Sequence, residues 1–280
     1  MGTGLEPDLV LPRQVARWAA TDPDRPFMVE IAGRSVTYGQ FYDEMLRWVE
    51  YLRDLEIEPR QRIASFLPAS IDSQLLWLAA SCLGAYEVNV NPELRGEMLR
   101  HVLTDSDAVR CFARPDNAAV VTESGIDVAV TVVPRGASFV SDWPATPLDQ
   151  LPSPSDVSCV IYTSGTTGPS KGAVIRWAQF SAILGRTPRA WFGPDNAVYA
   201  PLPMFHVTGR TPTVTMADVG GRVVLRERLS IGEFWRDILE HNCTSTTAAS
   251  AALLLAAPRD SDSARARARM TQASLDATVP

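Results

Sequence analysis

The segment Tyr162-Thr-Ser-Gly-Thr-Thr-Gly-Pro-Ser-Lys-Gly172 directly follows the apolar run 157–161 and carries the strongest signal in the sequence. Glycine has no Cβ, so backbone N–H groups in this segment can turn toward an anion and approach it closely. Hydroxyl side chains add neutral hydrogen-bond donors, and the lysine adds a mobile positive charge. The segment therefore predicts a polyphosphate-binding loop with the ligands Thr163, Ser164, Gly165, Thr166, Thr167, Gly168 and Lys171.

Two other interpretations of this segment are a Walker-type P-loop and a surface turn without a ligand. A Walker loop needs glycine immediately before the lysine and Ser or Thr immediately after it. Here the neighbours of the lysine are Ser170 and Gly172. A Walker loop also leads into a helix, whereas residues 172–175 have the character of a short strand. The sequence favours a strand–loop–strand hairpin over a P-loop phosphotransferase.

Outside this segment, short apolar runs alternate with runs of helical periodicity. Such alternation indicates βαβ units, so we predict an α/β fold with mostly parallel sheets flanked by helices. The predicted strands are 27–31, 35–38, 62–67, 86–90, 109–113, 126–133, 157–161, 172–175, 198–200 and 222–225. The predicted helices are 41–55, 71–83, 93–104 and a segment after the capping box Ser230-Ile-Gly-Glu233, with a helix or irregular loop at 205–217.

Five prolines between residues 134 and 156 interrupt this alternation and predict a long connector. We expect a first α/β subdomain at 1–133, a Pro-rich connector at 134–155 and a second α/β region with the phosphate loop at 156–258. The two regions are expected to form one composite domain. The segment 259–280 has low complexity and no apolar periodicity, which predicts a disordered tail.

Composition excludes several classes of function. The formal charge of −6 gives no electrostatic footprint for nucleic acid or an anionic membrane. No apolar run approaches the length of a membrane span, and the first residues lack the features of a secretory signal. The four cysteines are widely spaced, which disfavours metal and disulfide roles. We expect a cytoplasmic protein without a nucleic-acid partner, a membrane span or a metal site of its own.

The segment Tyr162–Gly172 resembles the phosphate-binding signature of the adenylate-forming (AMP-binding) superfamily. A second segment, Pro201-Leu-Pro-Met-Phe-His-Val-Thr-Gly209, resembles a motif of its acyl-CoA synthetase/ligase branch. The resemblance implies that His206 and Gly209 line the substrate pocket and that Lys171 orients the outer phosphates of ATP. Residues 88–92 and 104–107 are also similar to family sequences.

The resemblance further implies the fold and the reaction of that family. The fold is that of the N-terminal domain of an acyl-CoA synthetase. The co-substrates are ATP, Mg²⁺ and CoA, none bound covalently, and a fatty or other carboxylic acid becomes an acyl-adenylate and then an acyl-CoA. The similar region, residues 10–255, corresponds to half of a family member.

Later family motifs do not occur in this sequence. They are the adenine- and magnesium-binding Tyr-Gly-x-Thr-Glu segment, the ribose-binding Thr-Gly-Asp segment and the C-terminal lid with its catalytic lysine. We therefore expect a truncated N-terminal domain without a complete catalytic set. Two functions remain open: an acyl-CoA ligase impaired by truncation, or a non-catalytic remnant that at most binds ATP weakly.

The remaining histidines and two tryptophans give weaker expectations. His101 and His241 lie on predicted helical segments without partners in the sequence, so both are expected to be surface or packing residues. Trp177 and Trp191 are candidates for the acyl pocket.

Overall fold

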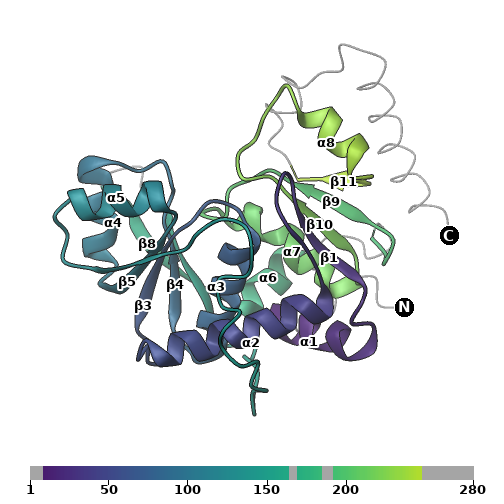
Figure 1. Cartoon of the computed structure of the whole chain (residues 1–280), viewed down its shortest axis with the longest axis horizontal. Coiled ribbons are helices and arrows are strands. Elements are labelled where there is room, and N and C mark those ends of the chain that lie inside the picture. Colours follow the sequence, from purple (N-terminus) through teal and green to yellow (C-terminus); the bar gives the residue numbers. More distant parts are fainter. Residues whose placement is uncertain (1–8, 164–168, 185–191, 248–280) are drawn as a thin grey trace.

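The computed structural model describes residues 9–163, 169–184 and 192–247. Within them, two sheets lie beside each other, with helices around and between them (Figure 1). The strands are β1 (Pro26–Glu30), β2 (Ser35–Thr37), β3 (Arg62–Phe66), β4 (Tyr86–Asn89), β5 (Ala108–Ala113), β6 (Ala129–Val132), β7 (Val157–Thr163), β8 (Lys171–Arg176), β9 (Ala197–Ala200), β10 (Arg222–Leu225) and β11 (Ser245–Thr246). The helices are α1 (Leu11–Thr21), α2 (Tyr38–Asp54), α3 (Ile71–Leu83), α4 (Gly96–Asp105), α5 (Pro115–Glu123), α6 (Trp177–Leu184), α7 (Val207–Val219) and α8 (Phe234–Glu240).

Both sheets are mainly parallel. The first has the strand order β11-β9-β10-β1-β2, and the second has the order β6-β5-β3-β4-β7-β8. The antiparallel pairs in these sheets are the hairpins β1–β2 and β7–β8. Parallel neighbours need long crossover connections, which the intervening helices and loops provide. The predicted α/β fold class is confirmed.

Each sheet combines strands from both sides of the Pro-rich connector. β1 precedes the connector and pairs with β10, which follows it. In the second sheet, β4 precedes the connector and pairs with β7. The domain boundaries at 133, 155 and 258 stay a prediction, and strand pairing crosses the connector in both sheets.

The connector contains no helix or strand between residues 134 and 156. Side-chain packing against α2 nevertheless fixes it. Val140 is fully buried, and the Phe139 ring lies 5.5 Å from the Trp48 ring. The Arg47 guanidinium donates a hydrogen bond to the Ser141 carbonyl at 3.1 Å. The connector is therefore held by packing rather than by secondary structure.

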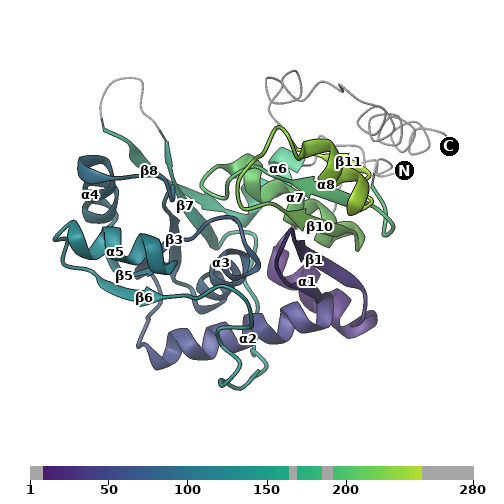
Figure 2. The same cartoon turned by 45° about the horizontal axis from the view of Figure 1, so that its top comes forward.

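Helix α3 lies at the centre of the molecule and contacts both sheets, as Figure 2 shows. All its residues from Ile71 to Ser81 are buried, which fits a helix that other elements surround. The Ser70 side chain accepts a hydrogen bond from the Ser73 N–H at its start, and Gly84 ends it with a φ of 78°. Glycine suits that end because other residues are strained at positive φ.

Some local predictions differ from the structure. The capping box at Ser230–Glu233 is wrong, because residues 231–233 form a turn and α8 begins only at Phe234. Ser230 is therefore too far from the free N–H groups of the first helical turn. Helices α1, α5 and α6 were not expected; α5 begins with Pro115, a residue that favours the first helical position.

Trp177 is a core residue rather than part of an acyl pocket. It is fully buried, its ring stacks on Trp77 at 5.2 Å, and its Nε1 donates to Ser81 Oγ at 2.8 Å. Trp191 and the predicted tail 259–280 lie outside the described residues. None of the helices in the described ranges is long and apolar enough to cross a membrane.

Candidate functional site

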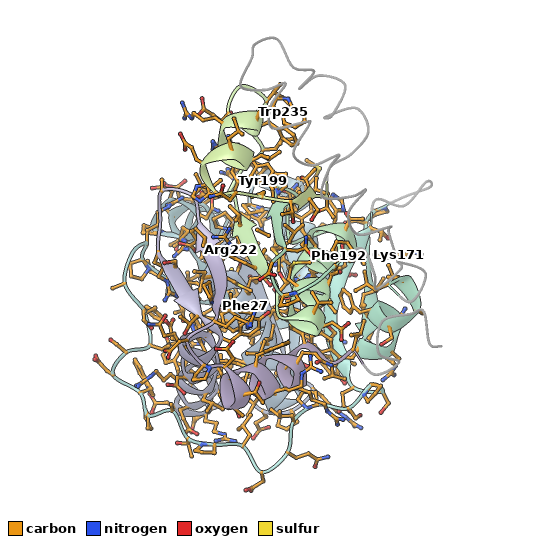
Figure 3. All side chains as sticks on the ribbon, turned by 90° about the vertical axis from the view of Figure 1, so that its right-hand side faces the viewer. Phe27, Lys171, Phe192, Tyr199, Arg222 and Trp235 are labelled. Carbon is orange, nitrogen blue, oxygen red and sulfur yellow. The ribbon has the colours of Figure 1, made fainter. Side chains whose placement is uncertain are left out.

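The predicted phosphate-binding segment lies at the end of the β7–β8 hairpin where the chain connects the two strands. The two strands are antiparallel, and Thr163 pairs with Lys171 as the outermost pair. Residues 172–175 lie within β8, which excludes a Walker-type loop leading into a helix and confirms the predicted hairpin. Both Thr163 and Lys171 are exposed, and Lys171 lies near the edge of the molecule in Figure 3. The other predicted ligands, Ser164, Gly165, Thr166, Thr167 and Gly168, lie outside the described residues.

Lys171 is the only lysine in the chain, although lysine and arginine together number 26. The chain thus uses arginine at every other basic position. Lysine differs from arginine in carrying a compact ammonium with three donors on a flexible stem. A compact charge can approach a single phosphate oxygen, which a planar guanidinium does less readily. The position of this lone lysine agrees with the predicted phosphate contact.

Tyr162 forms a fixed flank of the hairpin. It pairs with Gly172, where an added Cβ would lie 3.2 Å from the Tyr162 ring and 3.0 Å from Val160 Cγ1. Glycine at 172 therefore leaves room for the tyrosine ring. The Tyr162 hydroxyl donates to Asp105 Oδ2 at 2.6 Å. Partial burial and then this hydrogen bond raise the pKa of Tyr162, so its hydroxyl stays protonated at neutral pH.

His101 contacts the other flank of the hairpin. Its Nε2 lies 2.7 Å from the Ser170 carbonyl oxygen, and because a carbonyl only accepts, the imidazole donates. The His101 ring also meets the Tyr162 ring edge-on, with centroids 6.5 Å apart. The expectation that His101 has no partner is therefore wrong. Its partner lies 69 residues away in sequence, and no local pattern indicates it.

A cavity of about 580 Å³ joins the hairpin to the second predicted motif. Tyr162 and Ser170 line it from the hairpin, His101 from α4, and Phe205 and His206 from the segment before α7. Its apolar walls are Val90, Leu94, Met98, Val102 and Pro169. The structure thus brings His206 to the same cavity as the flank of the phosphate segment. The role of His206 in binding substrate stays a prediction.

His206 occupies the position just before α7. Its backbone is extended, and its side chain does not cap the helix. Its carbonyl accepts a hydrogen bond from the Gly209 N–H at 3.0 Å. The rings of Phe205 and His206 lie 4.6 Å apart. This geometry leaves the imidazole among the residues that line the cavity.

Packing explains why position 209 is a glycine, which the motif alone did not reveal. A Cβ at this position would lie 2.0 Å from the Pro203 carbonyl oxygen and 2.6 Å from its carbon. The first turn of α7 therefore packs directly on the backbone that precedes His206. Gly209 is not among the residues lining the described cavities, so its place in the substrate pocket stays a prediction.

A buried polar cluster lies behind this segment, and sequence reasoning missed it. Arg210 Nη2 and Glu87 Oε2 form an ion pair at 2.7 Å. Arg210 Nε donates to the Met204 carbonyl at 2.8 Å, and Asn89 Nδ2 donates to Glu87 Oε1 at 2.9 Å. The available signal was a charged residue among mostly uncharged neighbours in each of two elements, Glu87 in β4 and Arg210 near the start of α7.

A second cavity, of about 640 Å³, lies where β3, β5, β9 and β10 end. Leu67, Arg114, Pro201 and Glu227 line it just beyond these strands. Ligands of parallel α/β sheets commonly bind beyond the carboxyl ends of the strands. Phe205 and Asn91 line both this cavity and the one beside the hairpin. The two cavities therefore adjoin at the segment that precedes α7.

The described residues offer neither a metal cluster nor a reactive thiol at this site. In the ranges that the structure describes, no three His, Cys, Asp or Glu side chains are grouped to hold a metal ion. The four cysteines are free. Burial raises the pKa of Cys159 to about 11 and that of Cys111 to about 12, so both thiols are protonated at neutral pH.

Solved structures similar to this one include the N-terminal domain of an acyl-CoA synthetase and a putative CoA ligase. The inhibitor-bound N-terminal domain of FACL13 from Mycobacterium tuberculosis matches with a TM-score of 0.78 and 23% identity, covering 91% of this chain and 66% of that one. A putative long-chain-fatty-acid CoA ligase from Rhodopseudomonas palustris matches with a TM-score of 0.80 and 21% identity, covering 94% of this chain and 67% of that one. At this identity these matches show the fold alone.

The sequence relatives include CoA ligases. A sulfoacetate--CoA ligase from Cupriavidus necator is 30% identical over 258 residues, which are 87% of this chain and 50% of that protein. The medium/long-chain-fatty-acid--CoA ligase FadD6 from Mycobacterium tuberculosis is 28% identical over 244 residues, covering 81% of this chain and 40% of that protein. The chain thus spans half or less of the length of these relatives. The family model described as AMP-binding enzyme matches residues 15–277, so the chain belongs to the AMP-binding family of adenylate-forming enzymes, which includes acyl-CoA ligases.

Proposed function

We propose that this chain contributes the phosphate-binding half of an ATP-dependent acid–CoA ligase. The observation that carries the proposal is the outermost pair of the β7–β8 hairpin, Thr163 and Lys171. A hydroxyl and an ammonium are exposed there beside a cavity that His206 also lines. In this proposal the hairpin holds the outer phosphates of ATP, and the adjoining cavities hold the acid and the approaching thiol.

The first step joins the acid to AMP. A carboxylate oxygen attacks the α-phosphorus of ATP, and the bond to the bridging oxygen breaks. Pyrophosphate leaves with that electron pair, and an acyl-adenylate forms. The Lys171 ammonium and the Thr163 hydroxyl stabilise the charge that develops on the pyrophosphate. Each hydrogen bond to a charged oxygen contributes about 1.5–3 kcal/mol.

The second step transfers the acyl group to CoA. The thiolate sulfur attacks the acyl carbonyl, the bond to the AMP oxygen breaks, and AMP leaves with the electron pair. In this proposal His206, which lines the cavity beside the hairpin, donates an N–H to the carboxylate of the acid in the first step and orients it. Magnesium, where the family uses it, neutralises phosphate charge. The described residues contain no cluster suited to hold it, so no step is assigned to it here.

Exchange of labelled pyrophosphate into ATP tests the proposal. The purified chain is assayed with a panel of acids that includes sulfoacetate and medium- and long-chain fatty acids, which the names of the relatives specify. Exchange that depends on one acid supports the first step. ATP binding without exchange favours the non-catalytic alternative. A chain that neither binds ATP nor exchanges pyrophosphate contradicts the proposal.

A further inference from the structure

We infer that His101 and Asp105 of α4 are positioning residues that fix the two flanks of the phosphate-binding hairpin, so that Thr163 and Lys171 face one polyphosphate. The inference rests on the proposed function. It attributes the placement of the phosphate ligands to a helix that lies outside the recognised motif. Asp105 holds the β7 flank through Tyr162 at 2.6 Å. His101 holds the β8 flank through the Ser170 carbonyl at 2.7 Å.

The two contacts come from one face of one helix. Residues four apart in a helix lie above each other on the same side. His101 and Asp105 have that spacing on α4, and their partners lie on opposite sides of the hairpin, Tyr162 in β7 and Ser170 just before β8. One helix therefore contacts both flanks of the hairpin at once.

Helix α4 is a firm base for this role. Its other face buries Leu99, Val102 and Leu103. These side chains pack in one cluster with Val88 of β4 and Val160 of β7, near the middle of the second sheet. The helix thus shares a buried cluster with the strand that begins the hairpin, and a movement of α4 would disturb this packing.

The hairpin itself needs such support. β8 is the outer strand of its sheet and pairs only with β7 among the described strands. Where the chain connects β7 to β8, Thr163, Pro169 and Lys171 are all exposed, so little packing holds them. Donors that are fixed in advance bind an anion more tightly, because no ordering cost is spent on binding. The two contacts from α4 supply that fixation.

The test compares variants that remove each contact with variants that keep its hydrogen-bonding group. His101→Leu removes the donor, whereas His101→Gln places an amide N–H in a similar position. Asp105→Ala removes the acceptor, whereas Asp105→Asn keeps an oxygen for Tyr162. His241→Leu, the same substitution just after α8, serves as the matched control.

Two readouts are measured on the full chain. The first is affinity for inorganic tripolyphosphate and for ATP. Reductive methylation keeps the charge of Lys171, the only lysine, and its carbon signal reports binding at one site. The α-amino group is methylated as well, and its signal is identified because it remains in the Lys171→Arg variant. The second is hydrogen exchange at the backbone amides of Ser170 to Gly172 without ligand.

We expect His101→Leu and Asp105→Ala to weaken tripolyphosphate binding roughly fivefold or more, the equivalent of one net hydrogen bond. Both should also speed amide exchange. Affinity and amide exchange should stay close to those of the unsubstituted protein in His101→Gln, Asp105→Asn and His241→Leu. Unchanged binding in His101→Leu, or equal weakening in a folded His101→Gln, overturns the inference. If the unsubstituted chain binds no polyphosphate, the proposed function fails. In that case, amide exchange alone tests whether α4 holds the flanks of the hairpin.

Discussion

The Glu87 carboxylate and the Arg210 guanidinium form an ion pair at 2.7 Å with both side chains fully buried. Glu87 lies on β4 of the second sheet, while Arg210 lies on α7, which packs on β9 and β10 of the first. Arg210 also lies 4.5 Å above the Trp77 ring and donates to the Met204 carbonyl. One side chain thus joins the two sheets and anchors the backbone that leads to His206.

Removing one partner of this pair should be strongly destabilising. Arg210→Met leaves the Glu87 carboxylate buried without its partner, which typically costs about 3–5 kcal/mol. The double variant Glu87→Gln/Arg210→Met has no buried charge and should recover much of that loss. Urea unfolding of the unsubstituted protein, Arg210→Met, Glu87→Gln and the double variant measures the four free energies of unfolding. A double variant as unstable as the sum of its single variants would show that packing, and not charge, explains the cost.

Gly209→Ala should destabilise the protein by about 1–3 kcal/mol, the usual cost of overpacking. The added Cβ would lie 2.0 Å from the Pro203 carbonyl oxygen, so α7 must move away from the segment before His206. Gly232→Ala is the matched control, because a Cβ there has nothing within 4 Å. Thermal unfolding compares the two. Equal stability of Gly209→Ala and Gly232→Ala would contradict the close approach.

Alkaline pH should weaken the folded state through its buried thiols. Burial raises the pKa of Cys111 and of Cys243 from the ordinary 9.0 to about 12. Their contribution is therefore complete below pH 9 and is lost as pH rises toward 12, because the unfolded chain releases these protons first. Burial also raises the pKa of Tyr199, which acts in the same direction.

Urea unfolding at about pH 8 and about pH 10 measures this dependence. The free energy of unfolding should be lower at the higher pH, and Cys111→Ala should show a shallower decline. An unfolding free energy that stays constant or rises over this interval would argue against protonated, buried thiols.

Local pattern was sufficient to predict the hairpin and most helices. The residues of β7 and β8 are close in sequence, so their apolar runs and the glycine-rich segment between them indicate a turn directly. The amphipathic periodicity of α2 likewise identifies its buried face without knowledge of its partners. The capping box at Ser230 failed because residues 231–233 form a turn before α8 starts.

Local patterns could not predict contacts between segments that are distant in sequence. Glu87 and Arg210 are 123 positions apart, and their pairing depends on how the two sheets pack against α3 and α7. The contact between His101 and Ser170 depends likewise on the placement of α4. The sequence motif identified Gly209 as important, and only the structure gives the close approach of Pro203 as a physical reason.

Substitutions of Lys171 should separate charge from shape. Lys171→Ala removes the ammonium and should weaken ATP binding roughly tenfold or more. Lys171→Arg keeps the charge on a wider, planar group and should give an intermediate affinity. Arg176→Ala, at the far end of β8, is the control, since Arg176 contacts the Ser155 carbonyl and not the Thr163–Lys171 end of the hairpin. Calorimetric titration with ATP measures all four proteins. Equal affinities for Lys171→Ala and Arg176→Ala would exclude the lysine from the site.

The most direct measurement is the rate at which an amine-specific reagent acylates Lys171, located by mass spectrometry of the digested chain. The measurement is unambiguous because the chain has no other lysine side chain. If the β7–β8 hairpin binds the outer phosphates, ATP and tripolyphosphate should slow the labelling roughly fivefold or more, while AMP, which lacks those phosphates, should not. Labelling that proceeds equally fast with millimolar ATP, with AMP and without nucleotide would contradict the account.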